Sequence, residues 1–536
     1  MSSESLNTSD EAVRGRGQER STASEPPNPP YGNVAVKPSM FPLGYKEGFS
    51  QWWASIPAAV AEHRVLSFLP FLQQPPTQRQ TGNTADAPTG ATHTLETQDR
   101  SQEGDVSANS INDPYGPRRW RSTMVELSGQ NRALNEFSVE RVGEQADQNL
   151  VMLHGYGAGL GFFYKNFEPL SRPRGWHLYA LDLLGMGRST RPPFKIKAKD
   201  RQEANAEAEA WFVDALEEWR IKRGIKRFTL LGHSLGGYMA VAYALKYPGR
   251  VNKLILASPV GIPEDPHAVD ADMPEPSESG LANEFTQDQE SITGGQAGKT
   301  GDNNNFMNAR AKAAQSAETA PRRRLPKWFA YLWDQNVSPF SIVRWTGPFG
   351  PRIVSAWTSR RFSHLPSEEA KALHDYAYSI FRLRGSGEYA LTYVLAPGAF
   401  ARNPLIRRIH GVGRQTIQPL PEDTTSSTNP SSTAQSTSNS PPEKRENGIP
   451  VVFMYGDHDW MDVRGGHAAK AKIEEEKRRI LQNATPEERQ ADNASAKVVI
   501  IKKAGHHLYL DGADEFNQVV LEEMEDVSRK ERQRNQ

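Results

Sequence analysis

The sequence predicts an α/β protein with a mostly parallel central sheet, a helical cap and long disordered inserts. Three observations lead to this prediction. Short apolar runs recur along the chain, and several end at glycines or polar residues, as buried parallel strands do where they reach a loop. Tryptophans and aliphatic residues at 207–221 recur at helical spacing. Low mean hydropathy and 38 prolines among 536 residues indicate one folded domain interrupted by polar segments.

The elements of the core follow from these local patterns. Continuous apolar runs predict buried strands at Leu150–Leu153, Leu178–Asp182, Phe228–Leu231, Lys253–Ser258, Pro450–Tyr455 and Val498–Ile501. Two antiparallel strands are expected earlier in the chain, at Ser122–Leu127 and Glu136–Arg141. Helices are expected at Glu207–Ile221 and Tyr238–Tyr247.

Changes in composition predict how the chain is divided. We expect a disordered segment at 1–38, an aromatic amphipathic segment at 39–72, a disordered linker at 73–112, the first part of the core at 113–263, a disordered insert at 264–321, a helical cap at 322–410, a second disordered insert at 411–447, the second part of the core at 448–527 and a tail at 528–536.

One pentapeptide, Gly232-His233-Ser234-Leu235-Gly236, lies between an expected strand and an expected helix. This is the nucleophile-elbow pattern, in which a sharp turn strains the serine backbone and small neighbours let the strand and helix pack. The pattern alone is weak evidence in a chain with 42 glycines, so it needs support from other segments. With that support, it predicts Ser234 as a nucleophile.

Other expected strands end at residues suited to the same chemistry. The run at 150–153 leads into His154-Gly155-Tyr156-Gly157-Ala158-Gly159, a loop whose amides can approach a substrate carbonyl closely. We predict an oxyanion hole formed by the amides of Tyr156 (or Gly157 if the loop shifts) and Leu235. Asp459 and His506 each follow a later strand. The order serine, acid, histidine, each beyond a strand's carboxyl end, indicates an α/β-hydrolase fold.

Each catalytic role follows from elementary chemistry. Ser234 is a poor nucleophile unless a base takes its proton, and His506 is suited to that task. Asp459 is the expected acid that orients the imidazole and stabilises its protonated form. Asp457 and Asp462 remain alternatives, because Gly456 to Asp462 offers three carboxylates.

Several histidines compete with these assignments. His507 adjoins His506, which is preferred because it directly follows the glycine at 505. We expect His154 to brace its loop, and His233 and His458 to be pocket or packing histidines.

The spacing His506-x4-Asp511 also matches an acyltransferase signature, in which the histidine activates an acceptor hydroxyl. The competing interpretation is that Asp511 caps the helix expected after Gly512, and we favour capping. One imidazole cannot serve the serine and an independent acceptor site in the same step.

Composition excludes several classes of function. The 64 basic and 64 acidic residues balance, so no nucleic-acid partner is indicated. The absence of cysteine excludes disulfides and thiolate metal sites and fits an intracellular protein. No apolar run approaches the ~20 residues of a membrane-spanning helix. The acidic residues near the start fit neither a secretory signal nor a mitochondrial presequence.

Aromatic residues are concentrated in two segments, 39–72 and 326–362, and basic residues accompany the second. Tryptophan beside basic residues suits a phospholipid interface, whereas packing onto the core is an equal alternative for 326–362. For 39–72, contact with a membrane or lipid droplet is favoured. Arg344 and Arg407 are candidates to contact a lipid phosphate, with a solvated arginine as the alternative.

As a set, these motifs resemble one subfamily of α/β-hydrolases. It contains the lipid-droplet co-activator of triglyceride lipase, an N-acylphospholipid lipase, a plant lysophosphatidate acyltransferase and a fungal mitochondrial cardiolipin deacylase. The resemblance covers about 113–263, 322–410 and 448–527, and faintly 39–72. The matching segments are His154–Gly159, Asp182–Ser189, Gly232–Tyr238, Ser338–Phe340, Gly347–Pro351, Gly385–Glu388 and Gly505-His506-x4-Asp511.

The resemblance implies a serine hydrolase that deacylates phospholipids, most specifically cardiolipin, with Ser234, Asp459 and His506 as its triad and neither metal nor organic cofactor. Transfer of an acyl group from acyl-CoA to lysophosphatidate is the first alternative, and a non-catalytic co-activator is the second. The co-activator branch lacks the elbow serine, which this chain retains as Ser234. Location at a membrane is implied, in the mitochondrion or otherwise at a lipid droplet or in the cytoplasm.

Overall fold

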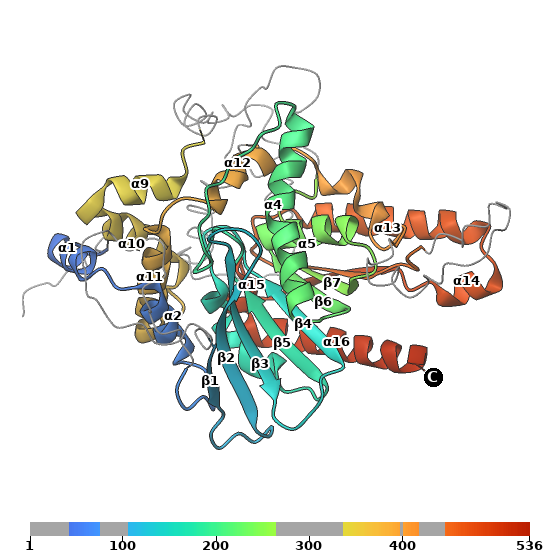
Figure 1. Cartoon of the computed structure of the whole chain (residues 1–536), viewed down its shortest axis with the longest axis horizontal. Coiled ribbons are helices and arrows are strands. Elements are labelled where there is room, and N and C mark those ends of the chain that lie inside the picture. The colour runs from blue at the N-terminus through green and yellow to red at the C-terminus, as the bar shows by residue number, and fades with distance from the viewer. Residues whose placement is uncertain (1–41, 76–104, 264–335, 397–399, 418–444, 536) are drawn as a thin grey trace, which may run out of the picture. The chain divides into compact units, whose positions relative to one another are not determined.

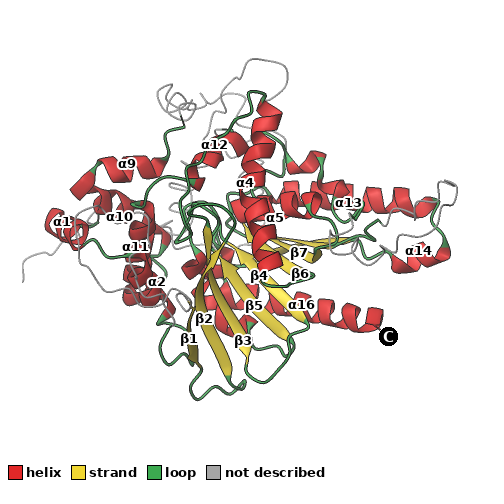
Figure 2. Cartoon of the chain, in the orientation of Figure 1, coloured by secondary structure: helices red, strands yellow, loops and turns green. Residues whose placement is uncertain are grey.

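The computed structural model describes residues 42–75, 105–263, 336–396, 400–417 and 445–535. These residues form a nine-stranded sheet with helices on both faces, in the order β1-β2-β3-β5-β4-β6-β7-β8-β9 (Figures 1 and 2). The expected α/β fold with a mostly parallel sheet is therefore confirmed. The predictions for 1–41, 76–104, 264–335, 397–399, 418–444 and 536 lie outside the described residues.

One edge of the sheet is antiparallel. It consists of β1 (Asp105–Asn109), β2 (Arg118–Glu126) and β3 (Ala133–Arg141), and β3 also pairs antiparallel with β5. The other neighbouring strands pair in parallel: β5 (Trp176–Leu181), β4 (Gln148–Leu153), β6 (Phe228–His233), β7 (Val251–Ala257), β8 (Pro450–Gly456) and β9 (Ser495–Ile501). Parallel pairing brings the carboxyl ends of these strands to one edge, where the candidate site lies.

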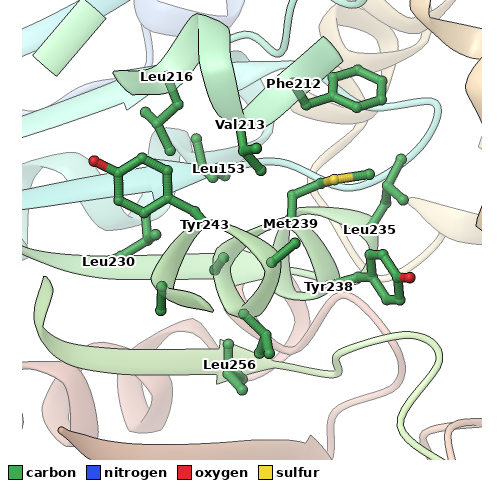
Figure 3. Close-up of a cluster of buried hydrophobic side chains, with 14 of the residues drawn as sticks. Leu153, Phe212, Val213, Leu216, Leu230, Leu235, Tyr238, Met239, Tyr243 and Leu256 are labelled. Carbon is green, nitrogen blue, oxygen red and sulfur yellow. The ribbon is translucent and has the colours of Figure 1, made fainter. Parts of the chain in front are cut away.

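The strands divide their side chains between two hydrophobic cores, one on each face. Along β4, Val151 and Leu153 belong to one core, whereas Leu150 and Met152 belong to the other. This division follows from the period of two along a strand, and it explains why the buried part of β4, Leu150–Leu153, is a continuous apolar run. Figure 3 shows the first core where α5 packs between the sheet and α4.

The first face is covered by α4 (Arg201–Lys222), α5 (Leu235–Lys246), α12 (Leu391–Val394) and α13 (Val463–Gln482), with the short turns η3 (Gly387–Ala390), η4 (Leu405–Arg407) and η5 (Ile409–Gly411). Asp200 caps α4 by accepting hydrogen bonds from the Gln202 and Glu203 amides, at 2.8 and 3.0 Å. The helix α14 (Pro486–Ala491) begins with a capping box formed by Thr485 and Glu488.

The second face is covered by η1 (Leu160–Phe163), α3 (Tyr164–Leu170), α15 (Leu508–Asp511) and α16 (Ala513–Asn535). The helical cap adds α9 (Pro339–Trp345), η2 (Gly347–Phe349), α10 (Gly350–Arg361) and α11 (Ser367–Phe381). None of the helices in the described ranges has the length and apolar character needed to cross a bilayer.

The N-terminal aromatic segment forms α1 (Tyr45–Ala54) and α2 (Ala58–Leu66), and the two differ in environment. Val65 and Leu66 of α2 are completely buried in the second core, and α2 packs against α11. Trp53 of α1, by contrast, is 73% exposed. The expectation of lipid contact throughout 39–72 is therefore wrong for α2, whose aliphatic face lies against the cap and core.

Three expected boundaries need correction. Residues 105–109, placed in a disordered linker, form β1, because pairing with β2 satisfies their backbone groups without an apolar run. The insert expected at 411–447 is ordered at both ends, where Thr416 forms a β-bridge with Arg445. Residues 528–535, expected as a tail, continue α16. Ser528 accepts a hydrogen bond of 2.9 Å from the Trp176 indole, which holds this polar end in place.

A buried polar cluster attaches α2 to the carboxyl edge of the sheet. Glu62 pairs with Arg188 and accepts hydrogen bonds from Asn135 and Tyr376, at 3.1 and 3.2 Å. Asn135 also donates to Asp182 at 2.8 Å. Burial raises the pKa of Glu62 from its ordinary value of 4.5 to about 7, with the nearby Asp182 acting in the same direction and Arg188 opposing. The Arg188 guanidinium pairs with Glu62, while Asp182 accepts from the Arg188 backbone amide at 2.7 Å.

This cluster predicts that stability falls as the pH rises. Because folding raises the pKa of Glu62, its contribution is complete below pH 4.5 and is lost as the pH approaches 7. Between pH 5 and pH 8 the free energy of unfolding should decrease by about 2 kcal/mol less in Glu62→Gln than in the wild type, because glutamine does not ionise and one pKa unit corresponds to about 1.4 kcal/mol. Urea unfolding at both pH values measures this difference. The exposed Glu126→Gln is the control, and an unchanged pH slope in Glu62→Gln would contradict the assignment.

Candidate active site

Ser234 is the single residue between β6 and α5, and its backbone is strained, with φ 51° and ψ −114°. A residue with a side chain adopts this left-handed region only when its surroundings enforce it. Here the strand and helix approach so closely that a Cβ atom on Gly232 would lie 2.3 Å from the Gly236 carbonyl oxygen. A Cβ atom on Gly236 would lie 2.6 Å from the Leu153 oxygen. The packing therefore holds Ser234 in a sharp elbow at the carboxyl edge of the sheet.

The loop after β4 lies directly against this elbow. A Cβ atom on Gly155 would be 2.8 Å from His233 Nδ1 and 3.0 Å from Ser234 Cβ, so only glycine fits there. Tyr156 follows Gly155 in the same loop. Leu235 is the first residue of α5, and the first amides of a helix have no acceptor within the helix. Of the two predicted oxyanion-hole residues, Leu235 thus follows Ser234 in the chain. Tyr156 follows Gly155, which lies against Ser234.

His154 braces the loop. Its Nδ1 donates to the Gly155 carbonyl at 2.7 Å, and its Nε2 accepts from the Leu183 amide at 3.0 Å. Burial lowers its pKa to about 4, so the ring is neutral and its proton is on Nδ1. Asp182 accepts a hydrogen bond of 2.7 Å from the Leu160 amide at the far end of the loop. These contacts match the bracing role expected for His154.

The predicted acid and histidine meet in the structure. His506 Nδ1 lies 3.1 Å from Asp459 Oδ1, and both side chains are buried. Asp459 also accepts hydrogen bonds from the Ser258 hydroxyl and, at 3.0 Å, from the Met461 amide. These donors direct the carboxylate toward one side of the imidazole, as an orienting acid requires.

Two further contacts tie this pair to the elbow. His233 Nε2 donates to the His506 carbonyl at 3.0 Å, and the two rings are 4.8 Å apart. The Ser234 amide donates to the Ala257 carbonyl at 2.9 Å, one residue before the Ser258 that holds the acid. Residues from β6, β7, β8 and β9 are thereby assembled at one edge of the sheet.

The alternative acids are engaged elsewhere. Asp457 accepts hydrogen bonds from the Lys503 and Ala504 amides, at 2.9 and 3.0 Å, and so joins the β8 and β9 loops. Asp462 caps α13 through the Arg464 amide at 3.0 Å and also pairs with the Arg464 guanidinium. None of these hydrogen bonds involves His506, so Asp459 is the acid that the geometry favours.

His507 and Asp511 both contact Arg361 of the cap. Arg361 Nε donates to His507 Nδ1 at 2.7 Å, and its Nη2 donates to both Asp511 oxygens, at 2.9 and 3.0 Å. Asp511 also accepts from the Gly505 amide at 3.1 Å. Among the described contacts, its carboxylate bonds to these groups rather than to the first turn of α16. The expectation that Asp511 caps this helix is therefore wrong, because a buried arginine occupies the carboxylate.

The cap packs against the loop after β4. Phe340 of α9 stacks on Tyr156 and on Phe381, with ring centroids 5.1 and 4.4 Å apart. A Cβ atom on Gly157 would lie 3.1 Å from the Phe340 ring. A small cavity of about 20 Å³, roughly one water molecule, is lined by Gly157, Phe340 and Phe381.

Arg344 does not project toward a phosphate site. Its guanidinium pairs with Glu388 at 2.6 Å and donates to the Leu383 carbonyl at 3.0 Å, which joins α9 to η3. Arg407 is exposed on η4. A separate cavity of about 840 Å³, lined by Arg227, Glu446 and other charged residues, lies at the amino ends of β7 and β8, away from the carboxyl edge.

Three residues of the site were not recognised from the sequence. Ser258, which holds Asp459, was assigned only to the end of a strand, although a polar residue after a buried strand was a usable signal. His233 was expected to be a pocket or packing histidine, and its bond to the backbone of the His506 loop has no local signature. Phe340 was one of many cap aromatics, and only the tertiary structure places it over the loop after β4.

Comparison with known proteins places the chain among the α/β-hydrolases. The family model of the alpha/beta hydrolase fold matches residues 148–347. The chain is 30% identical over 415 residues to the 1-acylglycerol-3-phosphate O-acyltransferase of Arabidopsis thaliana, covering 76% of this chain and 72% of that protein. It is 28% identical over 411 residues to 1-acylglycerol-3-phosphate O-acyltransferase ABHD5 of Mus musculus, covering 76% and 85%. It is 27% identical over 402 residues to (Lyso)-N-acylphosphatidylethanolamine lipase of Homo sapiens, covering 74% and 84%.

The carboxylate assignment can be tested with a fluorophosphonate probe that reacts with an activated serine. Asp459→Asn should slow labelling of Ser234 about a thousandfold or more, because the asparagine favours the wrong tautomer of His506. Asp462→Asn, at the start of α13, is the matched control and should label near the wild-type rate, whereas Asp457→Asn, which holds the loop before His506, should slow labelling less than Asp459→Asn. The rate of labelling, followed by gel fluorescence, measures the effect. Fast labelling of Asp459→Asn beside slow labelling of Asp457→Asn would reverse the assignment.

Proposed function

Because the chain belongs to the α/β-hydrolase family and its relatives act on lipids, we propose that it is a serine hydrolase that deacylates phospholipids, with cardiolipin as the preferred substrate. The observation that carries this proposal is the buried contact of 3.1 Å between Asp459 and His506, assembled beside the strained elbow at Ser234. No metal or organic cofactor takes part in the proposed chemistry.

The proposed reaction has two acyl-transfer steps. Ser234 Oγ forms a bond to the ester carbonyl carbon while His506 takes its proton, and the amides of Tyr156 and Leu235 stabilise the oxyanion. The carbon–oxygen bond to the glycerol then breaks, and His506 returns the proton to the leaving hydroxyl. Water, deprotonated by His506, cleaves the acyl-enzyme to give a fatty acid and free Ser234. Asp459 stabilises the imidazolium in both steps.

A lipid substrate is supported by an aromatic surface on the cap side. We define the aromatic surface as Tyr45, Phe49, Trp53, Ile342, Trp345 and Phe349. Each of these residues is between 41% and 73% exposed. The rings of Tyr45 and Phe349 are 6.2 Å apart, so α1 and η2 form one continuous face. Arg352 lies 3.5 Å above the Tyr45 ring. Exposed tryptophans beside a cation suit the headgroup region of a bilayer.

The helix α9 links the aromatic surface to the candidate site. On α9, Ile342 and Trp345 are exposed, whereas Phe340 stacks on Tyr156 in the loop after β4. We propose that insertion of the aromatic surface into a membrane moves α9 and withdraws Phe340, which admits the acyl chain. The protein would then act at a membrane or lipid-droplet surface, and cardiolipin as substrate implies mitochondrial membranes.

A second candidate is acyl transfer to lysophosphatidate. It is favoured by the names of the relatives in Arabidopsis thaliana and Mus musculus, both called acyltransferases of 1-acylglycerol-3-phosphate. In that reaction Ser234 attacks the thioester carbonyl of acyl-CoA, the carbon–sulfur bond breaks, and coenzyme A leaves as the thiol with the proton from His506. The lysophosphatidate hydroxyl then replaces water in the second step. A non-catalytic co-activator is disfavoured, because this chain retains the elbow serine.

Lipid analysis tests the proposed function directly. Purified wild-type protein and Ser234→Ala are incubated with vesicles containing cardiolipin, phosphatidylcholine, phosphatidylethanolamine and N-acylphosphatidylethanolamine. Only the wild type should convert cardiolipin to its monolyso form and free fatty acid. Consumption of another phospholipid would keep the class of reaction and change the headgroup. Parallel samples with acyl-CoA and lysophosphatidate measure transfer, and unchanged lipids in every wild-type sample would contradict enzymatic activity.

The aromatic surface makes a separate prediction. Trp53→Ala combined with Trp345→Ala should weaken binding to cardiolipin-containing vesicles about tenfold or more, since each ring buries apolar area worth over 1 kcal/mol. Vesicle flotation measures this binding. Ile221→Ala, an exposed apolar residue on α4, is the matched control. Unchanged flotation of the double variant would exclude this surface as the membrane contact.

A further inference from the structure

We propose that Asp511 and Arg361 are positioning residues that fix the His506 loop to the cap, and that Asp511 is not part of a separate acyl-acceptor dyad. This inference rests on the proposed function, because it concerns the group that serves Ser234. It assigns to the His506-x4-Asp511 motif a role that the spacing alone does not indicate.

The orientation of the carboxylate carries the first step. Both oxygens of Asp511 accept from Arg361 Nη2, at 2.9 and 3.0 Å, and Oδ1 also lies 3.4 Å from His364 Nε2. The side chain is only 7% exposed. The carboxylate thus faces the cap, where the charge of the Arg361 guanidinium, donated through one nitrogen, neutralises it.

The Asp511 side chain nevertheless contacts the backbone of the His506 loop. Its Oδ2 accepts from the Gly505 amide at 3.1 Å, one residue before His506. His506 Nδ1 is already engaged by Asp459. Among the described contacts, Asp511 therefore acts on the position of the loop rather than on the imidazole itself.

Arg361 holds the other side of the loop. This guanidinium is almost completely buried, and its Nε donates to His507 Nδ1 at 2.7 Å. Burial, and then the nearby Arg361 charge, keeps the pKa of His507 well below its usual range. His507 is therefore a neutral acceptor, and the Arg361 charge is balanced by Asp511.

Three elements thus hold three consecutive residues. Asp511 at the end of α15 holds the Gly505 amide, His233 at the end of β6 holds the His506 carbonyl, and Arg361 holds the His507 ring. Only Arg361 comes from the cap. Movement of α10 is therefore transmitted to the residues on both sides of the catalytic imidazole.

The two roles of Asp511 predict different kinetics. A positioning residue affects every step that needs His506, so probe labelling, hydrolysis and transfer should slow together. An acceptor dyad would affect only transfer to lysophosphatidate, because labelling of Ser234 by a fluorophosphonate involves no acceptor. The ratio of transfer to hydrolysis separates the two.

The test compares wild type, Asp511→Asn, Arg361→Lys and the double variant, with Asp514→Asn at the exposed start of α16 as the matched control. Asp511→Asn retains an acceptor for the Gly505 amide but loses the charge pair. Arg361→Lys retains the charge but cannot bridge two partners. Each single variant should slow fluorophosphonate labelling and lipid hydrolysis by the same factor, about 10- to 100-fold. The double variant should be little slower than either single variant, with an unchanged ratio of transfer to hydrolysis.

Two results would overturn the inference: wild-type labelling with selective loss of transfer in Asp511→Asn, or wild-type behaviour of both single variants. If Asp511→Asn does not fold, as judged by thermal unfolding, Arg361→Lys decides the outcome alone. A readout independent of turnover is the downfield proton NMR signal of His506 Nδ1–H, assigned by its loss in His506→Gln. It should shift or broaden in Asp511→Asn but not in Asp514→Asn. Failure of the wild type to label would reject the proposed function, while this signal would still test the positioning role.

Discussion

The close approach of β6, α5 and the loop after β4 is the constraint on which the rest of the site depends. Three glycines, at 155, 232 and 236, leave no room for a Cβ atom, and their contacts force the left-handed backbone of Ser234. The strain is local, whereas its stabilisation comes from the two large cores on the faces of the sheet. A rigid elbow in turn gives the loops after β7, β8 and β9 a fixed point around which to assemble.

Electrostatics separates the site into regions with different roles. Asp459 receives only neutral donors and the His506 ring in its described contacts, as an acid that must respond to a developing charge should. Asp511, by contrast, is neutralised by the buried Arg361. The two carboxylates lie at the same edge of the sheet, Asp459 in the loop after β8 and Asp511 at the end of α15, yet only Asp511 is balanced by a permanent cation in the described contacts. This difference in charge balance is consistent with the different roles proposed for the two residues.

The strands and the fold were predictable because a parallel strand buried on both faces must be apolar where it is buried, as Leu150–Leu153 of β4 and Pro450–Tyr455 of β8 are. The elbow and the candidate acid and histidine followed from the same pattern, since each lies where such a strand ends. The strand β1 was not predictable, because its polar residues are ordered by pairing with β2. The contact of Glu62 in α2 with Tyr376 of the cap and the arginine contact of Asp511 each join residues more than a hundred positions apart, and no local pattern records them.

The burial of α2 has a practical consequence for dissecting the N-terminus. Deletion of residues 1–72 would remove Glu62 along with the exposed aromatic residues. Arg188 and Asn135 would then lack the Glu62 carboxylate that they contact. Loss of membrane binding in such a protein would then be indistinguishable from damage to the sheet edge. Cutting between Ala54 and Ala58 separates the two, because the peripheral helix ends and the structural one begins there.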